Sequence, residues 1–568
     1  MKQGCVKRIL RAAPRALAIG VMAAGLGPWG CSGPASAGPG RESRPDSLVI
    51  LHTNDVHSHL DPFEVNGGER VGGVAARASL IARERARGGR VLLLDGGDLV
   101  QGTPYYNRFR GEPDHRLLDL LGYDAIALGN HDLDDGAAAW RRRAETTRTP
   151  ILSANVFAAA ESAWADRTAG PIPRAALRSV KWVGGGKTPA GTNLRYLATP
   201  YRIVERDGIR VAIFGLTTHS LDRIVAARKN RGVAVGSPIA AARELVPRLR
   251  READVVIALS HLGVEADRDL VDRVPGIDLV IGGHSHTPLF RPRLEGAAGG
   301  RATPIAQAGS WGRYLGRTTL RWSGDRARAS SGRLLTVRPE DGEDAAVEAV
   351  LASYRARLGA DLDRVVCRVP RRVETQGLST GDHPLGNFVA DVIRDRTGAD
   401  IAIMNAGGIR SPLPAGEVRE RDILSMLPFD NRLVVVRMTG AKVRSLLDGM
   451  ARRYGKGGFG HASGVSYVAR RDRAVEILVG SGPGGGAAAR GEPLDGNRVY
   501  RVATIDFLAD GGDYFDELRD AEPKERTEIL LSTAAIEYLK AHPDHRFGKD
   551  GRVRWRGSTE ALRDLGLR

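Results

Sequence analysis

The chain has 568 residues, 42% of them hydrophobic, and a formal net charge of +17. This length exceeds the size at which one hydrophobic core keeps growing, so we expect two domains, and the apolar content excludes a disordered chain. The arginines are scattered along the sequence without a basic run, which favours a solvated basic surface and argues against a nucleic acid as the partner.

The first 40 residues have the pattern of a secretory signal peptide. They contain five basic residues, no acidic residue and an apolar run, residues 16–26, that is too short to span a membrane as a helix. Ala35-Ser36-Ala37 fits cleavage that releases a soluble protein, whereas Gly30-Cys31 fits a bacterial lipoprotein signal, although Pro28 stands where such signals usually carry Leu. We therefore expect an exported protein, in the periplasm, outside the cell or at the cell envelope, with a lipid anchor at Cys31 as the alternative.

Short apolar runs alternate with polar, helix-like stretches from Ser47 to about Gly283. The runs lie at residues 48–51, 91–94, 125–128, 211–214, 255–259 and 279–281. Continuous apolar strands of this length suit a sheet that is covered on both faces, which predicts an α/β layered domain. Residues 304–322 are expected to form a closing strand pair. Only Cys367 remains after the signal segment, so an internal disulfide framework is excluded.

A charged stretch from about Asp344 to Leu358 is typical of a helix and is expected to link the two domains. A second α/β region follows from about Val366 to Trp555. Its expected strands lie near residues 401–404, 433–436 and 499–502.

Polar side chains gather where the strands of the first region end. They are Asp55 and His57, Asp98, Asn130 and His131, His261, and His284 with His286. Ligands of open α/β sheets bind beyond the carboxyl ends of the strands. Mixed carboxylate and imidazole ligands suit Zn, Mn or Co better than Mg or Ca. Because two cations roughly 3.5–4 Å apart need a shared anion, one Asp must bridge them, and such a pair deprotonates a water for in-line attack on phosphorus.

Five stretches of the sequence resemble the conserved blocks of calcineurin-like metallophosphoesterases. They are Leu51-His52-Thr53-Asn54-Asp55-Val56-His57, Asp95-Gly96-Gly97-Asp98, Gly129-Asn130-His131-Asp132, Ser260-His261-Leu262-Gly263 and Gly282-Gly283-His284-Ser285-His286. The later segments resemble the C-terminal domain of the bacterial and animal 5′-nucleotidases, a family that includes UDP-sugar hydrolases. The resemblance covers roughly Ser47 to Phe547.

This resemblance implies an α/β fold of the α+β layered kind, with an N-terminal four-layer β-sandwich flanked by helices and a C-terminal α/β substrate-binding domain. The implied boundaries are a signal peptide at 1–40, a calcineurin-like metallophosphoesterase domain at 45–340, a linker helix at 341–362 and a 5′-nucleotidase C-terminal domain at 363–560.

The resemblance also implies roles for the polar cluster. Asp55, His57, Asp98 and His286 would hold one metal, while Asp98 would bridge to a second one held by Asn130, His261 and His284. Ligation by His286 is open, because some members carry Gln there. His131 would face the phosphate, stabilising the transition state or protonating the leaving oxygen, and Asp134 would orient it. Asp135 is the adjacent alternative for that orienting role.

The C-terminal motifs imply a nucleotide pocket. Asn405-Ala406-Gly407-Gly408-Ile409-Arg410 combines a glycine-rich turn with an Arg that would pair with phosphate. Phe429 and Phe507 match the two rings between which the family stacks a base, Asp513 matches the carboxylate that binds ribose hydroxyls, and Asn431 is placed to contact the base. Stacking tolerates every base, so no base preference follows.

The sequence departs from the family pattern before Leu385-Gly386-Asn387, where many relatives carry one or two arginines. Residues 379–387 contain none, which should weaken binding of charged substrates or change which phosphate lies at the metals. Arg371 or Arg372 is the alternative source of a cation.

The expected function is an exported dinuclear-metal phosphohydrolase that releases phosphate from nucleoside 5′-phosphates, and also cleaves UDP-sugars, by attack of a metal-activated hydroxide. Its partner would be a nucleotide or another small phosphate ester. The alternative is a 2′,3′-cyclic-nucleotide phosphodiesterase or a related ester hydrolase. A non-enzymatic nucleotide-binding protein is disfavoured, because every expected type of metal ligand is present.

Overall fold

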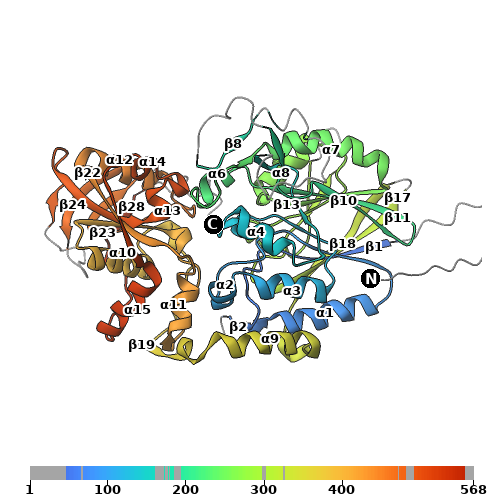
Figure 1. Cartoon of the computed structure of the whole chain (residues 1–568), viewed down its shortest axis with the longest axis horizontal. Coiled ribbons are helices and arrows are strands. Elements are labelled where there is room, and N and C mark those ends of the chain that lie inside the picture. The colour runs from blue at the N-terminus through green and yellow to red at the C-terminus, as the bar shows by residue number, and fades with distance from the viewer. Residues whose placement is uncertain are drawn as a thin grey trace, which may run out of the picture. The chain divides into compact units, whose positions relative to one another are not determined.

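The computed structural model describes residues 47–556 except 66–67, 160–171, 173–176, 178, 185–192, 297–301, 324–325, 471 and 482–490. The described residues belong to one compact unit, and Figure 1 follows the chain through it. The signal peptide expected at residues 1–40 and the lipid anchor expected at Cys31 lie outside the described residues. None of the helices in the described ranges combines the length and the apolar character that crossing a bilayer requires.

Two six-stranded sheets form the N-terminal part. The first has the order β18 (Arg326–Thr336), β17 (Tyr314–Ser323), β1 (Ser47–Thr53), β4 (Arg90–Asp95), β5 (Ala125–Ala127) and β6 (Ile151–Leu152). The second has the order β10 (Tyr201–Arg206), β11 (Ile209–Thr217), β13 (Val255–His261), β14 (Leu279–Ile281), β16 (Thr303–Ala306) and β15 (Arg293–Glu295). The strands β1, β4, β5 and β6 run parallel, and so do β11, β13, β14 and β16.

The two sheets pack face to face, and helices cover their outer faces. Leu48 and Ile50 of β1 join the core between the sheets, whereas the intervening Val49 and Leu51 join the core beneath the helices. Successive side chains of a strand point to opposite faces, so a strand covered on both sides must be apolar throughout. Full burial of one such side chain contributes about 1.5–3 kcal/mol. The layered α/β prediction is confirmed.

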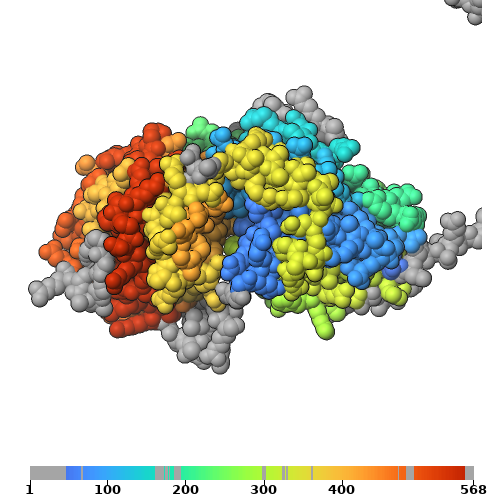
Figure 2. All heavy atoms as spheres, turned by 90° about the horizontal axis from the view of Figure 1, so that it is seen from below, coloured from blue at the N-terminus to red at the C-terminus, as the bar shows by residue number. Residues whose placement is uncertain are grey.

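Different helices cover the two outer faces (Figure 1). The first sheet is covered by α1 (Val74–Ala86), α3 (Glu112–Leu121) and α9 (Ala345–Leu358), and the second by α7 (Pro238–Glu252) and α8 (Val264–Arg273). The helix expected at residues 344–358 is therefore present as α9, and Asp344 caps its N-terminus by accepting from the backbone N–H groups of Ala346 and Val347. Figure 2 shows this yellow segment against the blue one that contains α1.

The expected pairing within residues 304–322 is wrong. The strand β16 extends the second sheet beside β14, whereas β17 lies in the first sheet between β1 and β18. Between them Gly309, Trp311 and Gly312 adopt positive φ and turn the chain from one sheet to the other. The partner of β17 is the following strand, and the two form a long antiparallel hairpin.

The C-terminal part is built on one mixed sheet. Its order is β25 (Glu492–Pro493), β24 (Ala474–Ser481), β23 (Gly460–Ala469), β20 (Ile401–Asn405), β26 (Val499–Ile505), β22 (Arg432–Thr439) and β27 (Lys524–Leu530), with β28 (Val553–Trp555) beside β23. The helices α10 (Pro384–Thr397), α12 (Gly440–Arg452) and α15 (Leu531–Ala541) pack with it around a separate apolar core. The three strands expected here are present as β20, β22 and β26.

Smaller elements complete the described part. They are β2 (Pro62–Glu64), β3 (Arg70–Gly72), α2 (Pro104–Phe109), α4 (Ala137–Ala144), β7 (Val156–Ala159), β8 (Lys181–Trp182), β9 (Leu194–Tyr196), α6 (Leu221–Ile224), β12 (Val233–Val235), β19 (Val365–Val369), β21 (Gly416–Arg419), α11 (Glu420–Met426), α13 (Asp506–Ala509) and α14 (Asp516–Arg519).

Candidate active site

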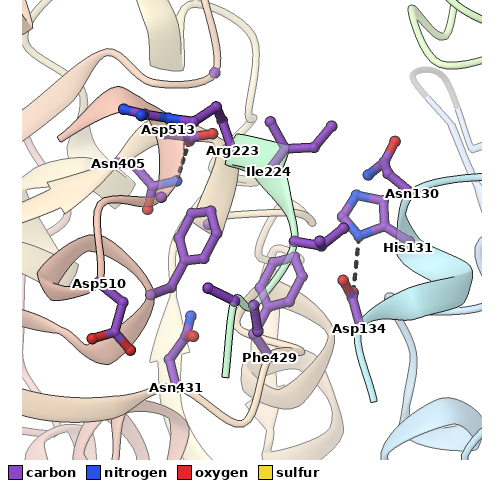
Figure 3. Close-up of a pocket in the computed structure, with 18 of the residues that line it drawn as sticks. Asn130, His131, Asp134, Arg223, Ile224, Asn405, Phe429, Asn431, Asp510 and Asp513 are labelled. Atoms are coloured by element: carbon purple, nitrogen blue, oxygen red, sulfur yellow. Dashed lines mark hydrogen bonds and ion pairs between the residues drawn. The ribbon is translucent and has the colours of Figure 1, made fainter. Parts of the chain in front are cut away.

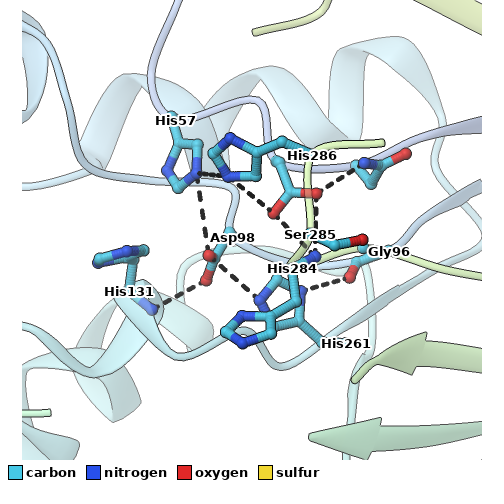
Figure 4. Close-up of polar contacts among 12 residues, drawn as sticks. His57, Gly96, Asp98, His131, His261, His284, Ser285 and His286 are labelled. Atoms are coloured by element: carbon cyan, nitrogen blue, oxygen red, sulfur yellow. Dashed lines mark hydrogen bonds and ion pairs between the residues drawn. The ribbon is translucent and has the colours of Figure 1, made fainter. Parts of the chain in front are cut away.

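The polar residues expected at strand ends gather at one edge of the two sheets. Asp55 and His57 follow β1, Asp98 follows β4, Asn130 and His131 follow β5, His261 is the last residue of β13, and His284 and His286 follow β14. The carboxyl ends of these parallel strands meet at this edge, so segments far apart in sequence converge there (Figure 4).

The backbone of this edge is strained. Five of the seven candidate metal ligands have φ in the left-handed region: Asp55 (50°), His57 (52°), Asp98 (56°), His284 (74°) and His286 (54°). A residue other than glycine held there costs of order 1–3 kcal/mol, so such strain persists only where the surrounding structure fixes it. The concentration of strained residues therefore points to a site selected for function.

A first group of ligand atoms comes from Asp55, His57 and His286. The Nε2 atoms of His57 and His286 lie 3.0 Å apart, and His286 Nε2 lies 3.5 Å from Asp55 Oδ1. Asp55 is fully buried and accepts from the backbone N–H of His284 at 3.0 Å and from Asn54 Nδ2 at 2.6 Å.

A second group comes from Asp98, His261 and His284. His261 Nε2 lies 3.1 Å from Asp98 Oδ2 and 3.2 Å from Asn130 Oδ1, which places Asn130 beside this group. Asp98 Oδ2 is also 3.8 Å from His57 Nε2, so Asp98 lies between the two groups, as Figure 4 shows. The other oxygen of Asp98 accepts from the backbone N–H of His131 at 2.8 Å.

The chemistry of these donor atoms fits two cations. Nδ1 of His261 donates to Gly96 O at 2.8 Å, and Nδ1 of His57 lies 3.3 Å from Val100 O, so the lone pairs of their Nε2 atoms face the site. Burial lowers the pKa of His57 and of His286, which favours neutral rings, and a neutral imidazole has one unprotonated nitrogen that can bind a cation. A cation between the two Nε2 atoms would use such a lone pair from each ring.

The buried carboxylates of the edge support the same conclusion. Burial raises the pKa of Asp55 to about 7, which means that the chain itself supplies too little positive charge to balance this group. For His261, burial opposes the imidazolium, but Asp98 outweighs it and raises the pKa to about 10 in the absence of any other cation. A divalent ion at each group would compensate the carboxylates and replace that proton.

His131 lies beside the two groups and is held by Asp134. Its Nδ1 is 2.9 Å from Asp134 Oδ2, whereas Asp135 pairs with Arg110, Arg143 and Lys229. The structure thus places Asp134, and not the alternative Asp135, next to His131. Burial lowers the pKa of His131, but Asp134 and Asp98 outweigh this effect and raise it above the ordinary value of 6.5.

A cavity of about 520 Å³ opens on this edge. All six residues expected to bind substrate line it: Asn405, Arg410, Phe429, Asn431, Phe507 and Asp513. His131, Asp134, Asn130, Asp98, His284 and His286 line it as well, so the candidate ligands and the C-terminal motifs share one space. Figure 3 shows Phe429 and His131 facing the same cavity, with Asn405 and Asp513 on its other side.

We call the six lining residues expected to bind substrate the C-terminal wall, and the edge that carries the two groups of candidate metal ligands the metal-binding edge. Two contacts join this wall to this edge. Arg410 Nη2 lies 3.4 Å from His57 Nε2, and the ring of Phe429 lies 5.7 Å from the ring of His131. On the far side of the cavity, Asn405 Nδ2 donates to Asp513 Oδ2 at 2.7 Å. An anion between Arg410 and the metal ligands would therefore lie within reach of His131.

The missing arginines are not replaced as expected. Neither Arg371 nor Arg372 lines the cavity, and Arg372 pairs instead with Glu374 at 2.9 Å. The cationic residues that do line it include Arg223, Arg228, Arg453 and Lys456, which the sequence did not single out. Of these cations, only Lys456 could have been found from the sequence. It lies in the glycine-rich turn Gly455-Lys456-Gly457-Gly458, which combines backbone freedom with a cation, as a phosphate-binding turn does.

Two family models match the chain. The calcineurin-like phosphoesterase model matches residues 48–288, and the 5′-nucleotidase C-terminal domain model matches residues 363–520.

Individual relatives have the same combination. The chain is 29% identical to a trifunctional nucleotide phosphoesterase protein of Bacillus subtilis over 87% of its own length, but it spans only 34% of that longer protein. It is 28% identical to the 5′-nucleotidase of Bos taurus, with 85% of this chain and 86% of the relative covered. The crystal structure of a 5′-nucleotidase precursor from Thermus thermophilus superposes with a TM-score of 0.77 at 29% identity, covering 90% of this chain and 99% of the other. The chain therefore belongs to the family of metal-dependent phosphoesterases that join a calcineurin-like phosphoesterase domain to a 5′-nucleotidase C-terminal domain.

Proposed function

We propose that this chain releases phosphate from nucleoside 5′-phosphates at a two-metal centre. The observation that carries the proposal is the shared cavity, in which two groups of metal-ligand type face a wall that carries a cation, two aromatic rings and a carboxylate. The same cavity is the basis for proposing UDP-sugars as further substrates, since a UDP-sugar also carries a base, a ribose and a 5′-phosphate.

Asp55, His57, Asp98 and His286 would hold one divalent cation, and Asp98, Asn130, His261 and His284 the other. Two such cations, when bound, lower the pKa of a water molecule and neutralise charge that develops on the phosphoryl oxygens. The imidazole-rich ligand set favours Zn, Mn or Co over Mg or Ca.

His131 would act at the phosphoryl group through Nε2. Its Nδ1 is held by Asp134, which fixes the ring orientation and stabilises the imidazolium. Burial lowers the pKa of His131, but Asp134 and Asp98 raise it above its ordinary value, which favours the imidazolium; in that form Nε2 can donate a proton to a phosphoryl oxygen or to the leaving oxygen.

The C-terminal wall would orient the nucleotide. Arg410 pairs with the phosphate, and Phe429 and Phe507 stack on the base. Asp513, held by Asn405, accepts from the ribose hydroxyls, and Asn431 contacts the edge of the base. This arrangement would bring the 5′-phosphate to His131 and the metal ligands.

A 2′,3′-cyclic-nucleotide phosphodiesterase is the second candidate, and one observation favours it. Residues 379–387 contain no arginine and do not line the cavity, so this segment does not supply the phosphate-pairing arginines that many relatives carry there. A cyclic phosphodiester carries a single negative charge, for which Arg410 alone would suffice.

Export is proposed on the basis of the N-terminal sequence, in which basic residues precede an apolar run and then small residues. Fractionation of the producing cells checks this. Metabolic labelling with a lipid precursor, comparing the unmodified chain with Cys31→Ser, separates lipid anchoring from release.

The enzymatic proposal is tested by removing and restoring metal. After treatment with a chelator, three reactions should stop: phosphate release from AMP, cleavage of UDP-glucose to UMP and glucose 1-phosphate, and ring opening of 2′,3′-cyclic AMP to a nucleoside monophosphate. Mn, Co or Zn should restore them. AMP should be the best substrate, whereas preference for the cyclic nucleotide would support the second candidate. Asp98→Asn should stay inactive with every metal. If no metal restores turnover on any ester while a nucleotide still binds, the chain is a binding protein and the proposal is wrong.

A further inference from the structure

The segment that carries Asp513 contains a second strained residue. Asp513 and Tyr514 are consecutive non-glycine residues with φ of 50° and 66°, and a bulky aromatic residue is especially disfavoured in this region. Glycine would occupy the same conformation without strain. A tyrosine therefore persists here only if its side chain contributes something that glycine cannot.

The side chain of Tyr514 reaches across to the N-terminal part. Its hydroxyl lies 3.1 Å from Ser220 Oγ, and the guanidinium of Arg223 lies 5.0 Å from the centre of its ring. Arg223 also pairs with Asp516 at 2.5 Å. On the other side, the backbone carbonyl of Tyr514 accepts from Arg453. Tyr514 thus links the segment that carries Asp513 to α6.

The α6 segment lines the same cavity as the aromatic rings. Residues 222–229 all line it, and within them Ile224 presents an apolar side chain and Arg223 a cation. Figure 3 shows Arg223 and Ile224 across the cavity from Asn431. A second pair of contacts holds the end of this segment, because Arg228 pairs with Asp506 at 3.5 Å and with Asp510 at 3.3 Å.

We propose that Tyr514 positions α6 as a third wall of the base-binding part of the cavity, and that this wall makes the site selective for esters that carry a nucleobase. Phe429 and Phe507 offer two faces for stacking, and Ile224 closes the space beside them. A small phosphate ester that occupies only the metal-binding edge does not reach α6. The inference rests on the proposed nucleotide substrate and adds a positioning residue that acts through α6.

Binding of adenosine tests this inference without metal and without turnover, because adenosine has a base and a ribose but no phosphate. In the presence of a chelator, Tyr514→Gly should raise the Kd for adenosine about tenfold, since stacking and enclosure of one base are worth roughly that factor or more. Tyr514→Phe, which removes only the hydroxyl, should raise it by about two- to threefold, a typical effect of one neutral hydrogen bond. Ile224→Ala should reproduce most of the larger effect.

If Tyr514 served only to stabilise the fold, Tyr514→Gly would lower the Tm together with the affinity for adenosine. Tyr514→Gly relieves an unfavourable φ, so its Tm should not fall, and a loss of adenosine affinity cannot then be attributed to misfolding. Asp207→Gly is the matched control, because Asp207 has a φ of 47° in the turn between β10 and β11 and does not line the cavity. This variant should leave the Kd unchanged.

Kinetics extend the test to the metal-loaded enzyme. Tyr514→Gly should raise KM for AMP about tenfold, in proportion to the lost base binding, and leave kcat/KM for p-nitrophenyl phosphate within about twofold. If Tyr514→Gly leaves the adenosine Kd unchanged, or if the unmodified chain does not bind adenosine, the inference is overturned. If adenosine binding behaves as expected but no phosphate ester is hydrolysed, the proposed hydrolytic function is wrong, whereas the role of α6 in base binding is supported.

Discussion

The metal-binding edge and the C-terminal wall of the cavity differ in how their side chains are fixed. At the edge, Asp55, His57, Asp98 and His261 are almost fully buried, and backbone carbonyls or N–H groups hold their second polar atoms. On the wall, Arg410, Phe429 and Phe507 are only partly buried. The edge is thus preorganised for small ions, whereas the wall leaves room for a substrate. Changes at the edge should affect every substrate alike, and changes on the wall should affect substrates differently.

The largest effect is expected for His131→Ala. Removing the imidazole that we propose to face the phosphate should lower kcat by about 10²–10⁴-fold on AMP and on p-nitrophenyl phosphate alike, because general acid–base catalysis contributes this range. Metal content, measured on the same samples, should not change. A loss confined to AMP would place His131 on the substrate wall and contradict its assignment to the edge.

Asp134→Asn should have a smaller effect on the same two substrates. The amide cannot stabilise the imidazolium, and loss of such an orienting partner typically costs about 10–100-fold in activity. Asp135→Asn is the matched control, because the neighbouring carboxylate pairs with Arg110, Arg143 and Lys229 and not with His131. Equal losses in the two variants would contradict the pairing of His131 with Asp134.

The difference between edge and wall also explains what the sequence could predict. The edge follows from strand ends: the parallel strands of the first sheet bring Asp55 and Asp98 together, and His261 ends a parallel strand of the second sheet that packs against the first. The choice between Asp134 and Asp135 was open, because adjacent residues on one turn point in directions that only the packing around them decides. The predicted pairing within residues 304–322 is wrong for a related reason. The two strands are consecutive in sequence, but long-range packing places them in different sheets. No local pattern reveals that Tyr514 contacts Ser220, because that contact joins segments 294 residues apart.

On the wall, the largest effect is expected for Arg410→Ala. A charge-assisted hydrogen bond to phosphate contributes about 1.5–3 kcal/mol, so kcat/KM for AMP should fall by about 10–100-fold. Arg410→Lys should recover part of this loss, because lysine retains the charge but not the bidentate geometry. If adenosine binding falls as strongly as AMP hydrolysis does, Arg410 contacts the nucleoside and its assignment to the phosphate is wrong.

Phe429→Ala should separate nucleotides from small esters. Loss of one stacking face should raise KM for AMP by about tenfold, because base stacking contributes about 1–3 kcal/mol, and should leave p-nitrophenyl phosphate nearly unaffected. Phe290→Ala is the matched control, since Phe290 is exposed on the N-terminal part and does not line the cavity. An equal loss on both esters would indicate that Phe429 supports His131, whose ring it contacts, more than it supports a base.

The smallest effect is expected for Lys456→Ala. This prediction depends on a difference between Lys456 and other cations that line the cavity, which already form ion pairs. Arg110, Arg223, Arg228, Lys229 and Arg519 each pair with a carboxylate. Lys456 also lines the cavity but forms no ion pair with any residue in the described ranges. Its turn is fixed beside the glycines that precede Arg410, because Gly407 N donates to Gly457 O at 2.7 Å.

An unpaired ammonium in this position should favour substrates that carry a second phosphate. Lys456→Ala should raise KM for ADP by up to about fivefold and KM for AMP by less, since exposed ion pairs contribute only about 0.2–1 kcal/mol. The ADP effect should shrink at high salt, because solvent-exposed charges are screened. Lys229→Ala, which removes a paired cation from the same cavity, should not distinguish the two nucleotides. Equal effects of the two lysines on ADP would show that overall charge, and not the position of Lys456, governs binding of the second phosphate.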